Sequence, residues 1–439
     1  MVLAKLRILG VHLVILSIVA AAALAASLTF GRVTQAPRLP PFPSLPVRIH
    51  DNATTDPIAR ANVGLPPGEG HGKGPDPGVR VMMVTPEGVS LRTAGKHVKW
   101  IGTTHAVRDL AQLAAIVADP AWISEPTPGV IRLRAALIME RGTVLTVAPP
   151  SVHLLRMMAN VPGVFLGASG ARLVIRAATI TSSQPSYAGT YRPFVLADEG
   201  SSMQITYARL AGLGWNWNDS YGVAWKDRST GGATRSTFTG NYFGLYTGRV
   251  SGVKFIRNAV TGNFFYGVDP HTYSSHLTVV GNTVTGNGRH GIIFSDHVNG
   301  STVADNFVRA NAANGIMMDD DSTGNVIRDN TVAGNHGDGI VLARSPANRV
   351  VGNVVRGNRV GLRLTGTRPR GLKLSGNVLS GNAVNAQGVL RAAGNTIADD
   401  TRRVWNADGL AVVWVLGAVL VTVTLMSLTA CLLGDRQAL

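Results

Sequence analysis

Short runs in which apolar and polar residues alternate begin at about residue 130 and continue through the middle of the chain. The segments 130–134 (Val-Ile-Arg-Leu-Arg) and 143–147 (Thr-Val-Leu-Thr-Val) are examples. Alternation over so few residues predicts short β-strands, each with one buried face. We therefore expect residues 130–400 to form an all-β structure made of many such strands.

The turns between these strands recur at a fixed interval, which indicates the kind of β-structure. A coil of about 24 residues cannot bury its apolar face alone, so neighbouring coils stack about 4.8 Å apart around one core. The period therefore predicts a right-handed parallel β-helix of about eleven coils. Stacked asparagines would bond to one another through their amides and adopt the left-handed backbone that corners need. Three series keep a step of 23 or 24 residues: Asn258, Asn282, Asn306, Asn330, Asn353 and Asn377; Asn263, Asn287, Asn311, Asn335, Asn358 and Asn382; and Gly267, Gly291, Gly315 and Gly339.

Uncharged apolar segments occur near both ends of the chain. Residues 8–30 follow Lys5 and Arg7 and are long enough to span a bilayer, as are residues 409–434. The Ala-Leu-Ala tripeptide at 23–25 fits a signal-peptidase site, so the first segment is either a retained anchor or a cleaved signal peptide. The positive charges ahead of it place the N-terminus in the cytoplasm and the body of the protein outside.

A short helix is expected before the β-helix, because Val107, Leu110, Leu113, Ala114 and Val117 recur at helical spacing and could cap its N-terminal end. These features divide the chain into six parts. They are a signal-anchor or signal peptide (1–35), a Pro/Gly-rich linker (36–80), a cap region (81–129), the β-helix (130–400), a second linker (401–408) and a transmembrane helix (409–434).

Composition narrows the choice of partner. Lys and Arg outnumber Asp and Glu by 41 to 25, a formal net charge of +16. This excess indicates an anionic partner, either a lipid surface or an acidic polysaccharide, unless it only reflects a generally basic proteome. No Lys/Arg-rich run or nucleic-acid motif is present, which argues against nucleic acid. The single cysteine, Cys431, excludes an internal disulfide, and no His, Cys and Asp set has the spacing of a zinc site.

Aligning the coils on the glycine series maps one face of the β-helix. Residues one and three positions after each glycine are apolar, so those two and four positions after it are expected to point outward. In the coil of Gly267 the outward residues are Asp269 and His271. A carboxylate at this place could fix the orientation and tautomer of a catalytic base.

Charged and polar residues surround this pair in the neighbouring coils. The cations of the preceding coils could hold a substrate carboxylate, and the following coils add a serine and two carboxylates. Two other histidines, His290 and His297, lack such neighbours and are expected to be ordinary surface residues. The residues expected to bind substrate are Lys226, Arg228, Arg249, Ser295, Asp296 and Asp319.

The hexapeptide Tyr266–His271 (Y-G-V-D-P-H) resembles the Y-G-x-D-P-H motif of mannuronan C5-epimerases, especially the periplasmic, alginate-modifying type. The likeness continues through 243–246 and 290–293 and covers about residues 130–400. In that family the motif histidine abstracts H5 of a mannuronate residue, a basic side chain neutralises the carboxylate, and a tyrosine or a water returns the proton from the opposite face. The resemblance implies that His271 is the general base and Tyr266 a catalytic tyrosine. The chemistry requires no cofactor.

The chain departs from the family pattern at two places. Removing H5 beside a carboxylate adds a second negative charge, so cations aimed at that carboxylate are the largest requirement of the reaction. Where the periplasmic enzymes have an arginine for this purpose, this chain has Asp296, and Thr272 replaces the usual aspartate after the motif histidine. Arg249 and Lys226 are the cations that could supply the missing charge.

Three functions remain open from the sequence. The first is an epimerase acting on a uronate polymer at the membrane, together with polysaccharide biosynthesis and export proteins. The second is a lyase, because the same C5 carbanion can expel the 4-linked sugar. The third is a non-catalytic polysaccharide-binding scaffold of the cell envelope, which the departure at Asp296 favours.

Overall fold

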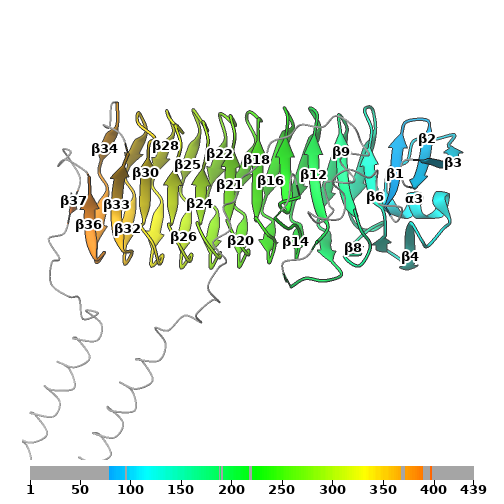
Figure 1. Ribbon diagram of the computed structural model, residues 1–439, viewed down its shortest axis with the longest axis horizontal. Helices are drawn as coiled ribbons and strands as arrows, with labels where there is room; N and C mark the ends of the chain where they lie inside the picture. Colours follow the sequence, from blue (N-terminus) through cyan, green and yellow to red (C-terminus); the bar gives the residue numbers. More distant parts are fainter. Residues whose placement is uncertain are drawn as a thin grey trace, which may run out of the picture. The chain divides into compact units, whose positions relative to one another are not determined.

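A computed structural model describes residues 79–93, 96–186, 188, 191–216, 220–366, 371–388 and 396–397. Within them the chain winds into a parallel β-helix with three long sheets, and each coil adds one strand to each sheet (Figure 1). We name these sheets A, B and C in the order in which a coil visits them. Sheet B has ten strands, so the described part holds ten complete coils, close to the number expected.

The strands of sheet A, in spatial order, are β3 (Lys96–Gly102), β2 (Gly88–Thr93), β1 (Arg80–Thr85), β6 (Ala136–Met139), β9 (Phe165–Ser169), β12 (Phe194–Asp198), β15 (Val223–Lys226), β18 (Leu245–Gly248), β21 (Val268–His271), β24 (Ile292–Phe294), β27 (Ile316–Met318), β30 (Ile340–Ala343), β33 (Val360–Thr365) and β36 (Val384–Gln387). Those of sheet B are β7 (Val144–Val147), β10 (Arg172–Arg176), β13 (Ser202–Thr206), β16 (Thr230–Thr234), β19 (Lys254–Ile256), β22 (Thr278–Val280), β25 (Thr302–Ala304), β28 (Val326–Arg328), β31 (Arg349–Val351) and β34 (Lys373–Ser375). Those of sheet C are β4 (Ile123–Thr127), β5 (Val130–Leu133), β8 (Leu154–Met157), β11 (Thr179–Ser182), β14 (Arg209–Ala211), β17 (Thr237–Thr239), β20 (Ala259–Thr261), β23 (Thr283–Thr285), β26 (Phe307–Arg309), β29 (Thr331–Ala333), β32 (Val354–Arg356), β35 (Val378–Ser380) and β37 (Thr396–Ile397).

The N-terminal end of the β-helix is closed by elements of a different kind. Strands β1, β2 and β3 pair antiparallel, as do β4 and β5, whereas β1 also pairs parallel with β6 and so continues sheet A. The helix α3 (Leu110–Val117) begins after Asp109, whose carboxylate accepts a hydrogen bond from the Gln112 amide. It buries its apolar side against β4, β5 and β7 (Figure 1), which confirms the predicted helix.

One apolar core runs through all the coils. The residues one position after each glycine, such as Val268 and Ile292, are fully buried in it, and so is Phe294 at the third position. The predicted inward positions are therefore confirmed. Glycine is required at these positions because the backbone of the next coil is too close for a side chain. A Cβ on Gly267 would lie 2.5 Å from the carbonyl oxygen of Gly291. Close stacking at this corner leaves no room for a side chain.

Both asparagine series form buried ladders, as predicted. In the first, the Asn282 side chain donates from Nδ2 to Oδ1 of Asn306 at 3.0 Å, and its Oδ1 accepts a bond from the Asn258 backbone amide at 2.9 Å. The second series repeats this pattern from coil to coil. The expected left-handed backbone, however, belongs to the residue before each asparagine, for example Arg257 at φ +54° and Gly262 at φ +59°. The asparagine keeps an ordinary φ because its amide must face the neighbouring coil.

The corners of a coil differ in how much their length varies. From β10 onward, two residues always separate a strand of sheet B from the next strand of sheet C. The corner between sheets A and B, in contrast, has from two residues after β9 to seven after β24. The corner between sheets C and A varies more, from two residues after β5 to eleven after β11. The corner between sheets B and C is therefore fixed, whereas the two corners that flank sheet A absorb the changes in coil length.

Both apolar terminal segments, Cys431 and the predicted linker up to residue 78 lie outside the described residues. Arg80, expected to end the linker, is the first residue of β1. Among the residues that are described, no helix is long and apolar enough to cross a membrane.

Candidate active site

The outward positions of sheet A form a stripe along the β-helix axis. Pairing between strands places Lys226 beside Gly248, Gly248 beside His271, and His271 beside Ser295. The same register links Ser169 to Asp198 at the N-terminal side. The stripe therefore consists of Ser169, Asp198, Lys226, Gly248, His271, Ser295 and Asp319. This confirms that His271 points away from the core and shares one face with Ser295 and Asp319.

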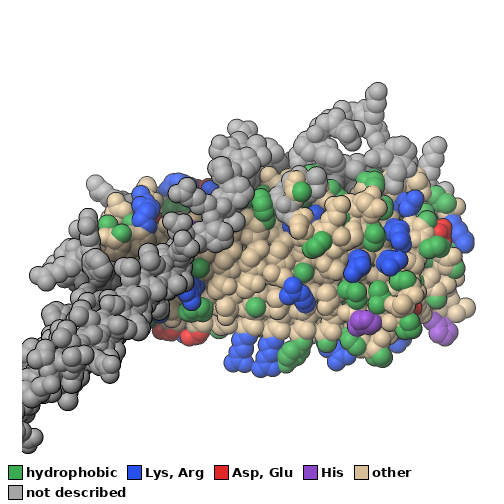
Figure 2. Space-filling view, turned by 90° about the horizontal axis from the view of Figure 1, so that it is seen from below, with side chains coloured by type: hydrophobic (Ala, Val, Ile, Leu, Met, Phe, Trp, Pro, Cys, Tyr) green, Lys and Arg blue, Asp and Glu red, His purple; other side chains and the backbone are tan. Residues whose placement is uncertain are grey.

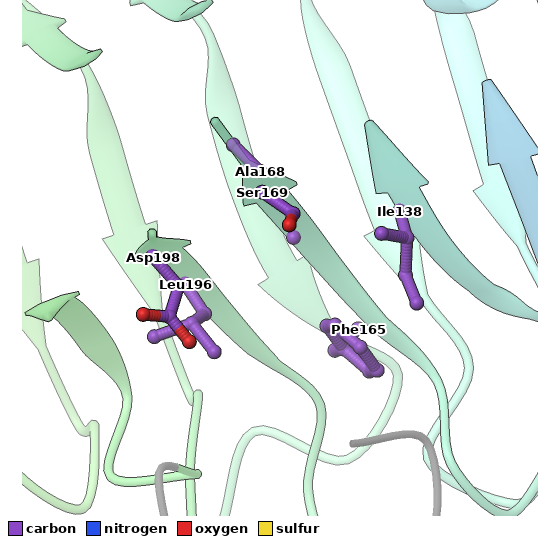
Figure 3. A pocket seen from close by; sticks show the side chains of 7 residues that line it. Ile138, Phe165, Ala168, Ser169, Leu196 and Asp198 are labelled. Atoms are coloured by element: carbon purple, nitrogen blue, oxygen red, sulfur yellow. The ribbon is translucent and has the colours of Figure 1, made fainter. Parts of the chain in front are cut away.

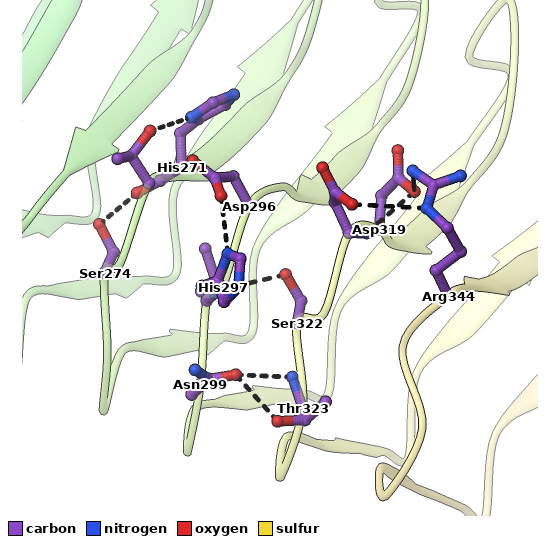
Figure 4. A network of polar contacts seen from close by, with 12 residues as sticks. His271, Ser274, Asp296, His297, Asn299, Asp319, Ser322, Thr323 and Arg344 are labelled. Atoms are coloured by element: carbon purple, nitrogen blue, oxygen red, sulfur yellow. Dashed lines mark hydrogen bonds and ion pairs between the residues drawn. The ribbon is translucent and has the colours of Figure 1, made fainter. Parts of the chain in front are cut away.

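The half-buried His271 ring is held by two neighbours. Its Nδ1 lies 2.5 Å from Oγ1 of Thr272 (Figure 4), and the ring stacks on Tyr246 of the preceding coil with centroids 6.1 Å apart. Thr272 has a φ of +36°, and a β-branched residue rarely adopts this left-handed conformation. Such strain costs about 1–3 kcal/mol and persists where the surroundings require it. Here it places the hydroxyl against the histidine.

Asp269 does not orient His271 as predicted. It is fully buried, and neither carboxylate oxygen has a hydrogen-bond partner among the described residues. Burial raises the pKa of the Asp269 carboxyl well above its usual value, which favours its neutral form. The expected contact fails because side chains two residues apart on a strand project in parallel, about 7 Å apart, and Thr272 occupies the position next to the His271 ring.

Gly248 leaves a gap in the stripe directly before His271. A Cβ built on Gly248 would lie 3.4 Å from the Tyr246 hydroxyl and 3.7 Å from Cε of Lys226. The ends of both side chains therefore lie over this glycine, although Lys226 belongs to the coil before it. Lys226 is 1% exposed, so the end of its side chain lies near Gly248 without being open to solvent.

The two predicted cations belong to a cluster that also contains two carboxyl groups. Nε of Arg249 lies 2.5 Å from Oδ1 of Asp227. Burial by itself would raise the pKa of Asp227, but hydrogen bonds with Arg249 and Asp198 and the charges of Arg249 and Lys226 lower it. Two cations, Lys226 and Arg249, therefore lie together with two carboxyl groups in the coils directly before His271.

Carboxylates follow His271 on its other side. Oδ1 of Asp296 lies 2.7 Å from Nδ1 of His297, and Oδ1 of Asp319 lies 3.1 Å from a guanidinium nitrogen of Arg344 (Figure 4). Burial raises the pKa of Asp319 despite the opposing charge of Arg344. Arg228, the remaining predicted binding residue, is exposed at the corner after Asp227. Asp296 therefore pairs with His297 of its own chain. It cannot supply the positive charge that an arginine supplies at this position in the family pattern.

Tyr266 lies in a column of stacked rings at the corner that leads into sheet A. Its ring packs on Phe243 at 5.1 Å and on His290 at 5.4 Å. Burial, and then the nearby carboxyl groups of Asp269 and Asp319, raise the pKa of Tyr266, so the phenol keeps its proton. His290 is buried, contrary to expectation, because its ring continues this column. Burial and the charge of Arg289 lower the pKa of His290 to about 3, so it is neutral.

A small, shallow depression lies on the same outer face toward the N-terminal end. It is lined mainly by apolar residues such as Phe165 and Leu196, together with Ser169 and Asp198 of the stripe (Figure 3). The depression is separate from the histidine, since the strands β15 and β18 lie between them.

Sequence reasoning missed four residues of this arrangement: Asp198, Asp227, Tyr246 and Thr272. Asp198 lies in a coil before the glycine series, so the spacing of the series could not place it beside Asp227. Tyr246 could have been found, because it occupies the outward position above Asp269. The fourth residue, Thr272, was noticed only as a departure from a motif.

Comparisons with known proteins agree with this geometry. A family model described as "Right handed beta helix region" matches residues 162–323, and one described as "Periplasmic copper-binding protein (NosD)" matches residues 266–411. The described residues contain no group of three or more His, Cys, Asp or Glu that could hold a metal ion, so the copper in the second description does not fit them.

Three relatives carry a more specific name. The mannuronan C5-epimerase AlgG of Azotobacter vinelandii is 30% identical over 215 residues, which are 42% of this chain and 40% of that protein. A mannuronan C5-epimerase of Pseudomonas aeruginosa is 29% identical over 191 residues, 39% of this chain and 34% of the relative. The crystal structure of a double mutant of the periplasmic alginate epimerase AlgG superimposes with a TM-score of 0.58 at 27% identity, covering 67% of this chain and 73% of that one.

Fold and comparisons together define a right-handed parallel β-helix protein with a histidine on its outer sheet A stripe. Within that class the chain is similar to mannuronan C5-epimerases, and the similar segment includes the hexapeptide motif. The chain spans only 33–40% of the length of three curated proteins that it matches.

Proposed function

We propose that this chain is an extracytoplasmic C5-epimerase of an acidic, uronate-containing polysaccharide, with His271 as its general base. The observation that supports it most is the position of His271, which lies on the outer stripe next to the coils that carry the cations Lys226 and Arg249. A uronate carboxylate beside His271 would be held by Arg249 and by the charge of the buried Lys226, while its H5 faces the histidine. The surplus of Lys and Arg, scattered over the face in Figure 2, also suits an anionic polymer.

The proposed reaction moves two protons and breaks no other bond. A ring nitrogen of His271 takes H5, and the electron pair of the C5–H bond passes into the carboxylate, where Lys226 and Arg249 stabilise the added charge. Tyr266 then donates its phenolic proton to C5 from the opposite face and regains one from solvent. Its raised pKa suits a donor, because the phenol is protonated before the step. Asp269 is buried with its neutral form favoured, and it takes no part in either proton transfer.

Tyr266→Phe should separate proton exchange from inversion. His271 would still remove H5 and return a deuteron to the same face, so proton NMR of mannuronan in deuterated water should show exchange at C5 without guluronate. Tyr246→Phe, which removes the hydroxyl of the ring that stacks on His271, is the matched control and should keep inversion. Inversion lost in Tyr246→Phe but retained in Tyr266→Phe would assign the donor role to Tyr246 instead.

A lyase would act at the same atoms but would expel the 4-linked sugar from the C5 carbanion. The same spectra distinguish it, because a lyase produces unsaturated chain ends. Guluronate without such ends is the expected result. Binding of uronate polymers without any exchange would favour the scaffold function, with Arg228, Ser295, Asp296 and Asp319 as binding residues only.

We further propose that the protein is held at the membrane by its apolar segments, 8–30 and 409–434, with the β-helix outside the cytoplasm. The periplasmic names of its relatives support this placement, as do Lys5 and Arg7 ahead of the first segment. A reporter enzyme that works only outside the cytoplasm should be active when fused after residue 388. Activity restricted to a cytoplasmic reporter at that position would contradict the topology.

A further inference from the structure

The corner beside His271 protrudes as a ledge over three successive coils. In each of them two consecutive non-glycine residues adopt left-handed φ values: Thr272 and Tyr273 (+36° and +54°), Asp296 and His297 (+63° and +61°), Asp320 and Asp321 (+50° and +57°). The coils on either side, at Arg249 and Arg344, have one such residue at this place. The ledge therefore begins at the coil of the proposed base and projects the second residue of each pair.

Tyr273 and His297 form an aromatic platform on this ledge. Their rings stack with centroids 4.8 Å apart and planes at 24°, the separation that neighbouring coils impose. Tyr273 is 62% exposed, more than any other large apolar or aromatic side chain of the described residues. Because His297 covers one face of the phenol ring, the exposed area lies on the other face and the edges.

The platform is fixed before any ligand arrives. Nδ1 of His297 lies 2.7 Å from Oδ1 of Asp296, and its backbone amide donates to the Asp320 carbonyl at 2.9 Å. The Tyr273 amide donates to the Asp296 carbonyl at 2.9 Å. A rigid exposed ring gives contact area without the entropy cost of ordering a side chain on binding.

We propose that Tyr273, backed by His297, is a sugar-stacking site that holds a pyranose ring of the polysaccharide next to the sugar at His271. A pyranose presents a face of polarised C–H groups, which the negative face of an aromatic ring attracts. Tyr273 lies two positions after His271, at most about 7 Å along the chain, so both can contact one polymer. Asp296, Asp320 and Asp321 line the ledge, so the bound sugar turns its carboxylate away from them, toward Arg228 and Arg249.

The test uses the full chain and a defined oligomannuronate, with binding followed by NMR titration. Tyr273→Ala should weaken binding by about tenfold, and the upfield shifts that ring stacking gives to sugar protons should disappear. Tyr273→Trp should retain both. Tyr207→Ala is a matched control, since Tyr207 is 59% exposed at the corner between sheets B and C and should have no effect. Equal melting temperatures of all variants would show that the fold is intact.

This site rests on the proposed function for its substrate, but the two can fail separately. Unchanged affinity and sugar shifts in Tyr273→Ala, in a protein that still exchanges H5, would overturn the stacking site alone. A Tyr273-dependent shift in a protein that never exchanges H5 would overturn the catalytic proposal and retain the site. Absence of oligomannuronate binding by the unmodified protein would overturn the stacking site as stated.

Discussion

His271→Gln should abolish exchange of H5 with solvent deuterium while leaving the fold and polymer binding intact. Glutamine can keep a polar contact with Thr272 but cannot accept a proton from carbon, so the first step of the reaction is lost. Proton NMR of mannuronan in deuterated water measures the exchange, and circular dichroism measures the fold. The residual rate should fall to the detection limit.

The matched control for this substitution is His276→Gln. His276 is exposed in the same corner but lies off the stripe, where its Nδ1 is 3.5 Å from Ser251 Oγ. Its variant should exchange H5 at the rate of the unmodified protein. Exchange that persists in His271→Gln would remove His271 as the base and with it the proposed mechanism.

Lys226→Met should lower turnover by about 100-fold or more, because it removes a charge that stabilises the transition state. Methionine retains most of the buried length of lysine, so the space over Gly248 stays filled. Steady-state kinetics on mannuronan would show the loss mainly in kcat, whereas a loss confined to KM would indicate ground-state binding only. Lys254→Met, an exposed lysine at the start of β19, is the control and should change neither value.

Removing one member of a buried charged cluster also affects stability, since Asp227 and Asp198 lose a cation. Thermal unfolding of Lys226→Met should therefore be measured beside the kinetics, at a temperature where the variant is fully folded. Normal turnover by the folded variant would show that the carboxylate is neutralised elsewhere.

The period of the sequence was sufficient to predict the coils, because each register position carries one side-chain type for a local reason. Asparagine fits a buried ladder and Gly267 a corner without space for a Cβ. Alternation within a strand then placed His271 on the outer face. These features depend on contacts with the next coil. The constant interval of 23 or 24 residues shows which residues are neighbours there.

The charge network could not be predicted in the same way. Whether Arg249 bonds Asp227 or a substrate depends on side-chain reach across coils, and Lys226 extends over Gly248 only because that glycine leaves space. Asp269 looked like a partner for His271 from its spacing, yet it is buried with a neutral form favoured. Whether an outward residue is buried depends on the size of its neighbours in adjacent coils. The alternation within a single strand does not contain that information.

The unequal corners also indicate how such a protein can diversify. An insertion between Arg257 and Asn258 would displace the asparagine from its ladder and interrupt the hydrogen bonds of two coils. An insertion between sheets A and B, for example after Ala343, would lengthen a segment that already varies from two to seven residues. Descendants of one ancestral solenoid can therefore acquire new substrate preferences by changing the two corners that flank sheet A, and loops grafted at these corners offer a direct route to engineered variants.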